Sequence, residues 1–234
     1  GGRWLLRNAP GAGGPRSRIG GYGCLAPWRD AYFAANGKVY ACCMLGDPMG
    51  DLNAQDWPDI WNGSPYRNLR RTIHGWNPSA ICRHCAMASG INGGDERRYR
   101  DFLDGMRAEP LPLDSGALAF GEGFHALERN PDGSPLQRWM GRTGSLTLPM
   151  RPGARFLRLT LFPRGPLGAI NPGVCRLDGG RPEYFDDTCE EAIFPLDKAR
   201  GGRIEAKLEM ENAWTVPPDR RSLALCIRGV AYLT

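Results

Sequence analysis

The chain has 234 residues, enough for one large domain or two ordinary ones. Its 30 Lys and Arg residues against 25 Asp and Glu residues give a net charge of +5. Both signs occur in both halves, which argues against a nucleic-acid-binding face. No stretch approaches the roughly 18 to 20 consecutive apolar residues of a membrane-spanning helix. We therefore expect a soluble cytoplasmic protein with no membrane span and no nucleic-acid partner.

Changes in composition along the chain suggest two domains. Residues 1–19 are rich in Gly, Pro and Arg without any period, so we predict a disordered or truncated lead-in. A cysteine-rich domain is predicted over residues 20–108, a linker over 109–116 and a second domain over 117–234. The first methionine is Met44, inside a structural motif. We therefore expect translation to begin upstream of this sequence.

The first domain opens with a predicted β-hairpin. Two short strand-like runs, 30–34 and 38–41, flank the pair Asn36-Gly37, which is typical of a type I′ turn. The turn would fold the chain back on itself. Cys42 at the end of the returning strand would then lie near Cys24, which precedes the outgoing one.

Two short helices are predicted next. One covers 57–61 with Asp56 as its N-cap, and the other begins at Ser64-Pro65, continues to residue 74 and ends at Gly75. An apolar stripe on the second helix, expected to pack on the hairpin, comprises Tyr66, Leu69 and Ile73. Trp57 and Trp61 are interpreted as core residues.

The cysteines predict a metal site. Eight cysteines suit a disulfide framework only in a short secreted chain, and nothing here indicates export. Cys82 and Cys85 form a C-x2-C corner, to which the hairpin would add Cys24 and Cys42. Four thiolates suit an iron–sulfur cluster and equally a structural zinc ion. Spacing alone favours zinc.

The residues around these cysteines resemble a known family. The resemblance spans roughly residues 20–90 and rests on Cys24-Leu-Ala-Pro-Trp28, Cys24-x12-Gly37-x4-Cys42, Ile60-Trp61-Asn62 and Cys82-Arg-His-Cys85. These segments look like the SPASM domain, the auxiliary iron–sulfur domain of radical S-adenosylmethionine (SAM) enzymes.

The resemblance implies one [4Fe-4S] cluster held by Cys24, Cys42, Cys82 and Cys85, and it reverses the preference for zinc. A second cluster, as in full SPASM domains, is not supported, because the next cysteine after Cys85 is Cys175. The C-x3-C-x2-C motif that binds the SAM-cleaving cluster is absent from this sequence. A radical SAM barrel, either upstream in the intact chain or on a separate subunit, is therefore the implied partner.

Other cysteine and histidine residues receive structural interpretations. Cys43 should point away from Cys42 along an extended strand and pack in the core. His84 is interpreted as an exposed corner residue and His74 as a cation near the carbonyl end of its helix. Three later cysteines are expected to be structural: Cys175, Cys189 and Cys226.

The second domain is predicted to be all-β. Apolar and polar residues alternate in runs separated by Pro and Gly turns, and these runs cover 146–148, 156–162, 203–210 and 223–233. This pattern favours an antiparallel β-sandwich. The fold class is therefore α+β, a small cysteine-rich metal-binding domain with a hairpin and short helices followed by the sandwich.

Several segments of this domain resemble a β-sandwich appended to bacterial glycosyltransferases and methyltransferases of surface-polysaccharide assembly. They are 123–128, 138–144, 212–217 and 219–225, the last being an Asp-Arg-Arg-x-Leu segment. The resemblance implies a glycan context. Trp139 and Trp214 could stack on sugar rings, although burial between the two sheets is the favoured interpretation.

Two hypotheses follow for function. The favoured one is the auxiliary-cluster portion of a radical SAM enzyme, relaying electrons or positioning a glycan or peptide substrate, with the sandwich docking substrate or partner. The alternative is a non-enzymatic scaffold whose four-cysteine site holds zinc and whose sandwich binds carbohydrate. No catalytic residue is assigned within the chain.

Overall fold

The computed structural model describes residues 24–44, 46–83, 85, 102–162, 170–196 and 202–234. The chain divides into two units, Gly1–Gly105 and Met106–Thr234. The predicted lead-in over 1–19 lies outside the described residues. None of the described helices is long and apolar enough to span a membrane.

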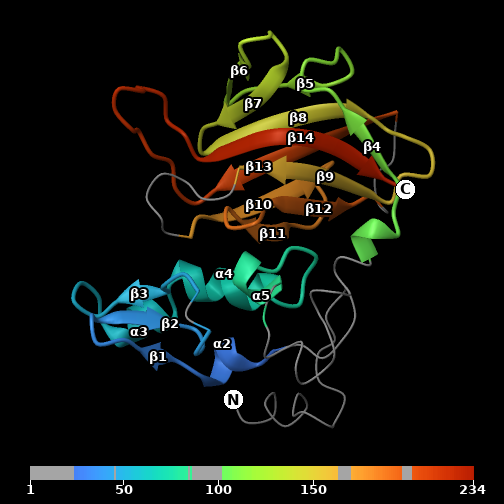
Figure 1. Ribbon diagram of the computed structural model, residues 1–234. Coiled ribbons are helices and arrows are strands. Elements are labelled where there is room, and N and C mark those ends of the chain that lie inside the picture. Colours follow the sequence, from blue (N-terminus) through green and yellow to red (C-terminus); the bar gives the residue numbers. More distant parts are fainter. Residues whose placement is uncertain (1–23, 45, 84, 86–101, 163–169, 197–201) are drawn as a thin grey trace. The chain divides into compact units, whose positions relative to one another are not determined.

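The first unit combines a small sheet with short helices (Figure 1). Its three strands are antiparallel in the order β1–β2–β3. They are β1 (Tyr32–Phe33), β2 (Lys38–Tyr40) and β3 (Gly50–Asp51). The helices are α2 (Ala26–Arg29), α3 (Trp57–Trp61), α4 (Ser64–Thr72) and α5 (Ala80–Arg83). The predicted hairpin and both predicted helices are present.

The hairpin turn differs from the prediction. Gly37 has φ +82°, and the only non-glycine residue with positive φ in the described part of the chain is Asp178. A type I′ turn needs positive φ at both central residues, so Asn36-Gly37 does not form one. The N–H of Gly37 donates to the Ala34 carbonyl at 3.0 Å. The turn therefore spans residues 34–37, one residue earlier than predicted, and Gly37 is its last residue.

The helices begin where the prolines predict. α3 starts after Asp56, whose side chain makes no capping hydrogen bond, and α4 starts after Gly63. The predicted apolar stripe of α4 is buried, with exposed fractions of 0% for Tyr66, 5% for Leu69 and 9% for Ile73. Its burial confirms that this face of α4 belongs to the core of the first unit.

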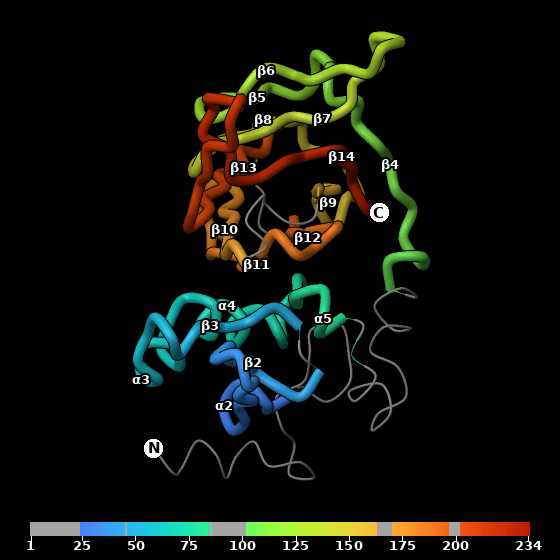
Figure 2. Tube along the Cα trace, turned by 60° about the vertical axis from the view of Figure 1, so that its left-hand side comes forward, coloured from blue at the N-terminus to red at the C-terminus, as the bar shows by residue number. Residues whose placement is uncertain are grey.

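The second unit is an antiparallel β-sandwich, as predicted (Figures 1 and 2). One sheet has the order β11–β10–β13–β8–β5, and the other has the order β12–β9–β14–β7–β6 with β4 also paired to β14. The first sheet contains β5 (Ala119–Phe120), β8 (Thr143–Pro149), β10 (Pro172–Leu177), β11 (Glu183–Asp186) and β13 (Arg203–Met210). The second contains β4 (Ala108–Leu111), β6 (Phe124–Arg129), β7 (Pro135–Met140), β9 (Phe156–Leu161), β12 (Glu191–Pro195) and β14 (Leu225–Leu233).

In strands of the sandwich core such as β13, buried side chains alternate with more exposed ones. The buried set of β13 is Ile204, Ala206, Leu208 and Met210. These side chains join a single apolar cluster with inward-facing residues of the opposite sheet, including Leu157, Leu159 and Ile227. Two sheets that each bury one face account for the fold.

The segment that we expected to link the two domains takes part in the sandwich. β4 begins at Ala108 and pairs antiparallel with the last residues of β14, with Leu111 opposite Val230. Pro110 has no N–H to give, but the ladder tolerates it at this peripheral strand. The alternating prolines and leucines over 110–113 thus belong to the end of an edge strand and the start of a turn.

Candidate metal centre

Cys24 lies directly before α2. The backbone N–H of Ala26 donates to the Cys24 sulfur at 3.4 Å. Desolvation by surrounding protein atoms raises the pKa of the Cys24 thiol, the Ala26 hydrogen bond opposes this, and Cys42 and Cys85 raise it further. Cys24 therefore shares its surroundings with two of the other predicted ligands.

Cys42 follows β2 and lies in a matching environment. Desolvation raises its pKa, a hydrogen bond from the Met44 backbone opposes this, and Cys85 raises it again. Cys24 and Cys42 thus each accept a hydrogen bond from the backbone N–H two residues later. Such N–H···S contacts favour the thiolate, which is the form that binds metals.

The C-x2-C corner spans the end of α5. Cys82 lies in α5, where its N–H donates to the Ser79 carbonyl at 2.8 Å, and Cys85 follows the helix. Cys42 and Cys85 raise the pKa of Cys24, and Cys85 raises that of Cys42, so the three thiols lie within electrostatic range of one another. No group of three or more His, Cys, Asp or Glu side chains in the described ranges is arranged to hold a metal ion as it stands. The four-cysteine ligand set therefore stays a prediction.

Helix α4 contacts both ligand-bearing segments. The Nε of Arg70 donates to the Pro27 carbonyl at 2.8 Å, and its Nη1 donates to the Trp61 carbonyl at 2.9 Å. The Tyr66 hydroxyl donates to the Tyr40 carbonyl at 3.3 Å. One helix thus holds α2, next to Cys24, and β2, next to Cys42.

His74 does not have the role that we predicted. Its Nε2 contacts the Cys24 carbonyl at 3.0 Å, so this nitrogen carries the proton and donates. The ring stacks on Trp28 with 5.4 Å between centroids. Desolvation lowers the pKa of His74 more than the Cys24 carbonyl raises it. The lowered pKa disfavours the charged form, and the ring bonds the Cys24 carbonyl instead of the end of α4, so the prediction of a helix-end cation is wrong.

Cys43 also differs from the prediction, since it is exposed. Residues 41–44 form a bend and turn after β2, so the alternation of an extended strand does not apply to them. His84 lies outside the described residues. Cys175, Cys189 and Cys226 are buried, which agrees with the structural role that we predicted.

Two tryptophans of the first unit, Trp57 and Trp61, belong to an aromatic cluster. Trp57 contacts Phe33 and Trp61, with ring centroids 5.2 Å apart in both pairs, and Trp61 lies 4.9 Å from Tyr66. The Arg70 guanidinium lies 4.4 Å from the Trp61 ring centroid. The cluster joins β1, α3 and α4. Both tryptophans are half-buried and lie outside the buried core, so the interpretation of Trp57 and Trp61 as core residues is wrong.

In the sandwich, neither Trp139 nor Trp214 belongs to the buried core between the sheets. Trp139 is half-buried beside Phe162, with 6.4 Å between ring centroids. Trp214 is also half-buried and forms a β-bridge with Leu223. Our expectation that both rings are buried between the sheets is wrong. Because neighbouring side chains of a strand point to opposite faces, Trp139 lies on the outer face of the sheet whereas Met140 faces inward.

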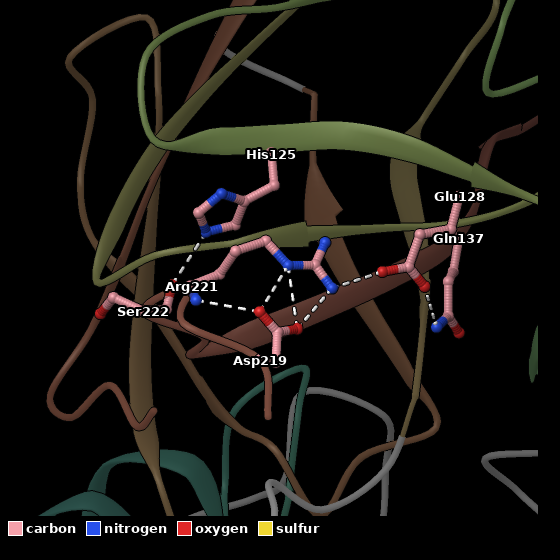
Figure 3. Close-up of polar contacts among 6 residues, drawn as sticks. All are labelled: His125, Glu128, Gln137, Asp219, Arg221 and Ser222. Atoms are coloured by element: carbon pink, nitrogen blue, oxygen red, sulfur yellow. Dashed lines mark hydrogen bonds and ion pairs between the residues drawn. The ribbon is translucent and has the colours of Figure 1, made fainter. Parts of the chain in front are cut away.

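The Asp-Arg-Arg-x-Leu segment forms a polar network (Figure 3). Arg221 Nη2 lies 2.6 Å from Asp219 Oδ2 and 2.7 Å from Glu128 Oε1, and Gln137 Nε2 donates to Glu128 Oε2 at 2.7 Å. Hydrogen bonds from Arg221 lower the pKa of Asp219 to about 2. His125 Nε2 donates to the Ser222 carbonyl at 2.9 Å. The network fastens the loop before β14 to β6 and β7.

Residues 24–86 match the family model of SPASM, described as an iron–sulfur cluster-binding domain. The match supports an iron–sulfur-binding role for the first unit. No curated protein sequence matches the chain.

Solved structures similar to the chain include a galactanase and a carbohydrate-binding module. An exo-β-1,3-galactanase from Phanerochaete chrysosporium is 12% identical over 54% of this chain and 29% of its own, with a TM-score of 0.35. A family 35 carbohydrate-binding module from Clostridium thermocellum is 12% identical over 54% of this chain and 98% of its own, with a TM-score of 0.33. The chain thus spans less than a third of the galactanase. Likenesses at this level say nothing about what the sandwich binds.

Proposed function

We propose that the first unit holds one [4Fe-4S] cluster on Cys24, Cys42, Cys82 and Cys85. The observation that carries the proposal is the SPASM match over 24–86, which includes all four cysteines. The nearness of three of these thiols and the N–H···S contacts support it. Four thiolates from separate chain segments suit the soft iron centres of such a cluster.

The cluster, when bound, would supply one-electron transfer. We propose that the chain is the auxiliary portion of a radical SAM enzyme, because the family that it resembles serves in that setting and its sequence lacks the C-x3-C-x2-C motif. A radical SAM barrel, in the same chain or on a partner, would supply the radical chemistry. The sandwich would dock a glycan or peptide substrate, or the partner.

Replacing single cysteines by serine tests the ligand set. Iron and sulfide content after anaerobic reconstitution should fall sharply in C24S, C42S, C82S and C85S, because serine replaces a thiolate ligand. C43S is the matched control, since Cys43 is exposed and adjacent to Cys42 but outside the proposed set. Wild-type iron content in C82S would refute the assignment of that residue.

Zinc is the competing occupant, because a four-thiolate site also suits it. A site that takes up one zinc ion and no sulfide, even after reconstitution with iron and sulfide, would point instead to a non-enzymatic scaffold. Metal identity thus separates the two functions without knowledge of the substrate.

A further inference from the structure

Three side chains four residues apart lie along one side of α4 and its end: Tyr66, Arg70 and His74. Residues at this spacing share a helix face. Each side chain reaches a backbone carbonyl in a segment that carries a predicted ligand: Tyr40, Pro27 and Cys24 respectively. The contacts are therefore directed at the chain around two ligands.

The contacts to the Cys24 segment fix its short helix at two points. His74 Nε2 donates to the Cys24 carbonyl at 3.0 Å, and Arg70 Nε donates to the Pro27 carbonyl at 2.8 Å. Between them lies Ala26, whose N–H donates to the Cys24 sulfur at 3.4 Å. Because the Cys24 and Pro27 carbonyls are both held, the backbone between them is fixed and the Ala26 N–H stays directed at the Cys24 sulfur.

Arg70 is unusual among the arginines of this unit. Its Nη2 is buried and has no hydrogen-bond partner among the described residues. Its two hydrogen bonds go to carbonyls, its guanidinium lies against the rings of Trp61 and Tyr66, and desolvation lowers its pKa. Arg70 as a whole is half-buried, and burying part of a cation costs stability unless hydrogen bonds or an opposite charge compensate it.

Tyr66 connects this cation to the second ligand. Its hydroxyl donates to the Tyr40 carbonyl, two residues before Cys42. Desolvation raises the pKa of Tyr66 to about 12, with Arg70 lowering it and Cys42 raising it. Tyr66 thus lies close enough to both Arg70 and Cys42 to interact electrostatically with each.

We propose that Arg70 and His74, supported by Tyr66, are positioning residues that raise the reduction potential of the cluster. This inference rests on the proposed function. Arg70 holds the Pro27 carbonyl and His74 holds the Cys24 carbonyl, and together these contacts keep the Ala26 N–H on the Cys24 sulfur. Net charge and hydrogen bonds to sulfur are what set the potential of such clusters.

The test measures the midpoint potential of the reconstituted full chain by spectroscopic redox titration, with iron content measured on the same samples. R70Q removes the guanidinium that holds the Pro27 and Trp61 carbonyls, which loosens the Ala26 N–H contact to the Cys24 sulfur, and should shift the potential to more negative values. H74F keeps a ring beside Trp28 but loses the donor, and it should shift the potential the same way. H74Q restores an N–H donor and should recover most of the H74F shift.

R67Q is the matched control on the same helix, because exposed Arg67 bonds only the Asn62 carbonyl, at 2.6 Å. Its potential should equal that of wild type. Wild-type potentials in fully loaded R70Q and H74F would overturn the inference.

If R70Q loads no iron, R70K is measured in its place. Lysine keeps the charge but lacks the planar guanidinium that bonds the Pro27 and Trp61 carbonyls together. A shift to more negative potential is therefore again expected. A wild-type potential in R70K would overturn the inference. A wild-type chain that takes up no cluster would instead refute the proposed function, and the inference with it.

Discussion

Arg221 connects two carboxylates on different parts of the sandwich, and the pKa values of these groups give a testable pH dependence. Hydrogen bonds from Arg221 lower the pKa of Asp219 to about 2 in the folded chain, whereas the pKa of an unfolded aspartate is about 3.9. A depressed folded-state pKa stabilises the fold above the unfolded pKa, and that contribution is lost as the pH falls through the folded pKa.

We therefore expect the urea midpoint of the sandwich transition to fall between about pH 4 and about pH 2, and D219N to lose part of this fall. Urea titrations at several pH values check this. E211Q, which removes an exposed carboxyl of the same unit, is the control and should keep the wild-type pH profile. An unchanged profile in D219N would contradict the role of the Asp219–Arg221 pair.

Single residues also show where sequence patterns stop being informative. The predicted ligands could be named because cysteine spacing is a strong signal. The contacts of His74 and Arg70 could not, because they join residues 50 and 43 positions apart in the chain. The burial of Cys43 was predicted wrongly because β2 ends at Tyr40. No residue between Tyr40 and Cys43 is of a type that indicates the end of a strand.

At the scale of elements, β13 gives the clearest test of the sandwich core. L208A removes a side chain that is 2% exposed, and such truncations cost about 2 to 5 kcal/mol. The free energy of unfolding of the sandwich should fall by that amount in denaturant titrations. K207A, on the opposite face of the same strand, should change it by no more than about 0.5 kcal/mol. Equal effects would contradict the register of β13.

The turn before β6 offers a second test. Gly123 has φ +85°, and a Cβ there would lie 1.7 Å from the Thr143 carbonyl oxygen. Gly133 has φ +83° with nothing within 4 Å of a Cβ. G133A should therefore cost only the backbone strain of about 1 to 2 kcal/mol, and G123A should cost clearly more. Denaturant titration compares the two, and equal costs would argue against the close approach of Thr143.

Sequence predicted four of the sandwich strands from their apolar residues, which alternate most cleanly with polar ones in Arg203–Met210. It missed strands such as β7 and β10, which begin with Pro135 and Pro172. Proline and short polar runs resemble loops in sequence. Only the pairing with neighbouring strands, which is long-range, makes them part of a sheet.

At the scale of the whole molecule, the chain divides into two units, and the buried apolar cluster of the sandwich consists of residues of the second unit. The proposed metal site belongs to the first unit. C82S should therefore lower the stability of the first unit and leave that of the sandwich unchanged. Hydrogen exchange resolved by segment checks this, with faster exchange expected around residues 24–83 alone. Equal loss of protection in β13 and β14 would contradict the independence of the units.

The measurement that tests the central claim most directly is the iron, sulfide and zinc content of the anaerobically purified chain, together with its visible absorption spectrum. The account predicts about four irons and about four sulfides per chain, with broad absorption near ~400 nm, as for a [4Fe-4S] centre. One zinc and no sulfide, unchanged by reconstitution with iron and sulfide, would contradict it.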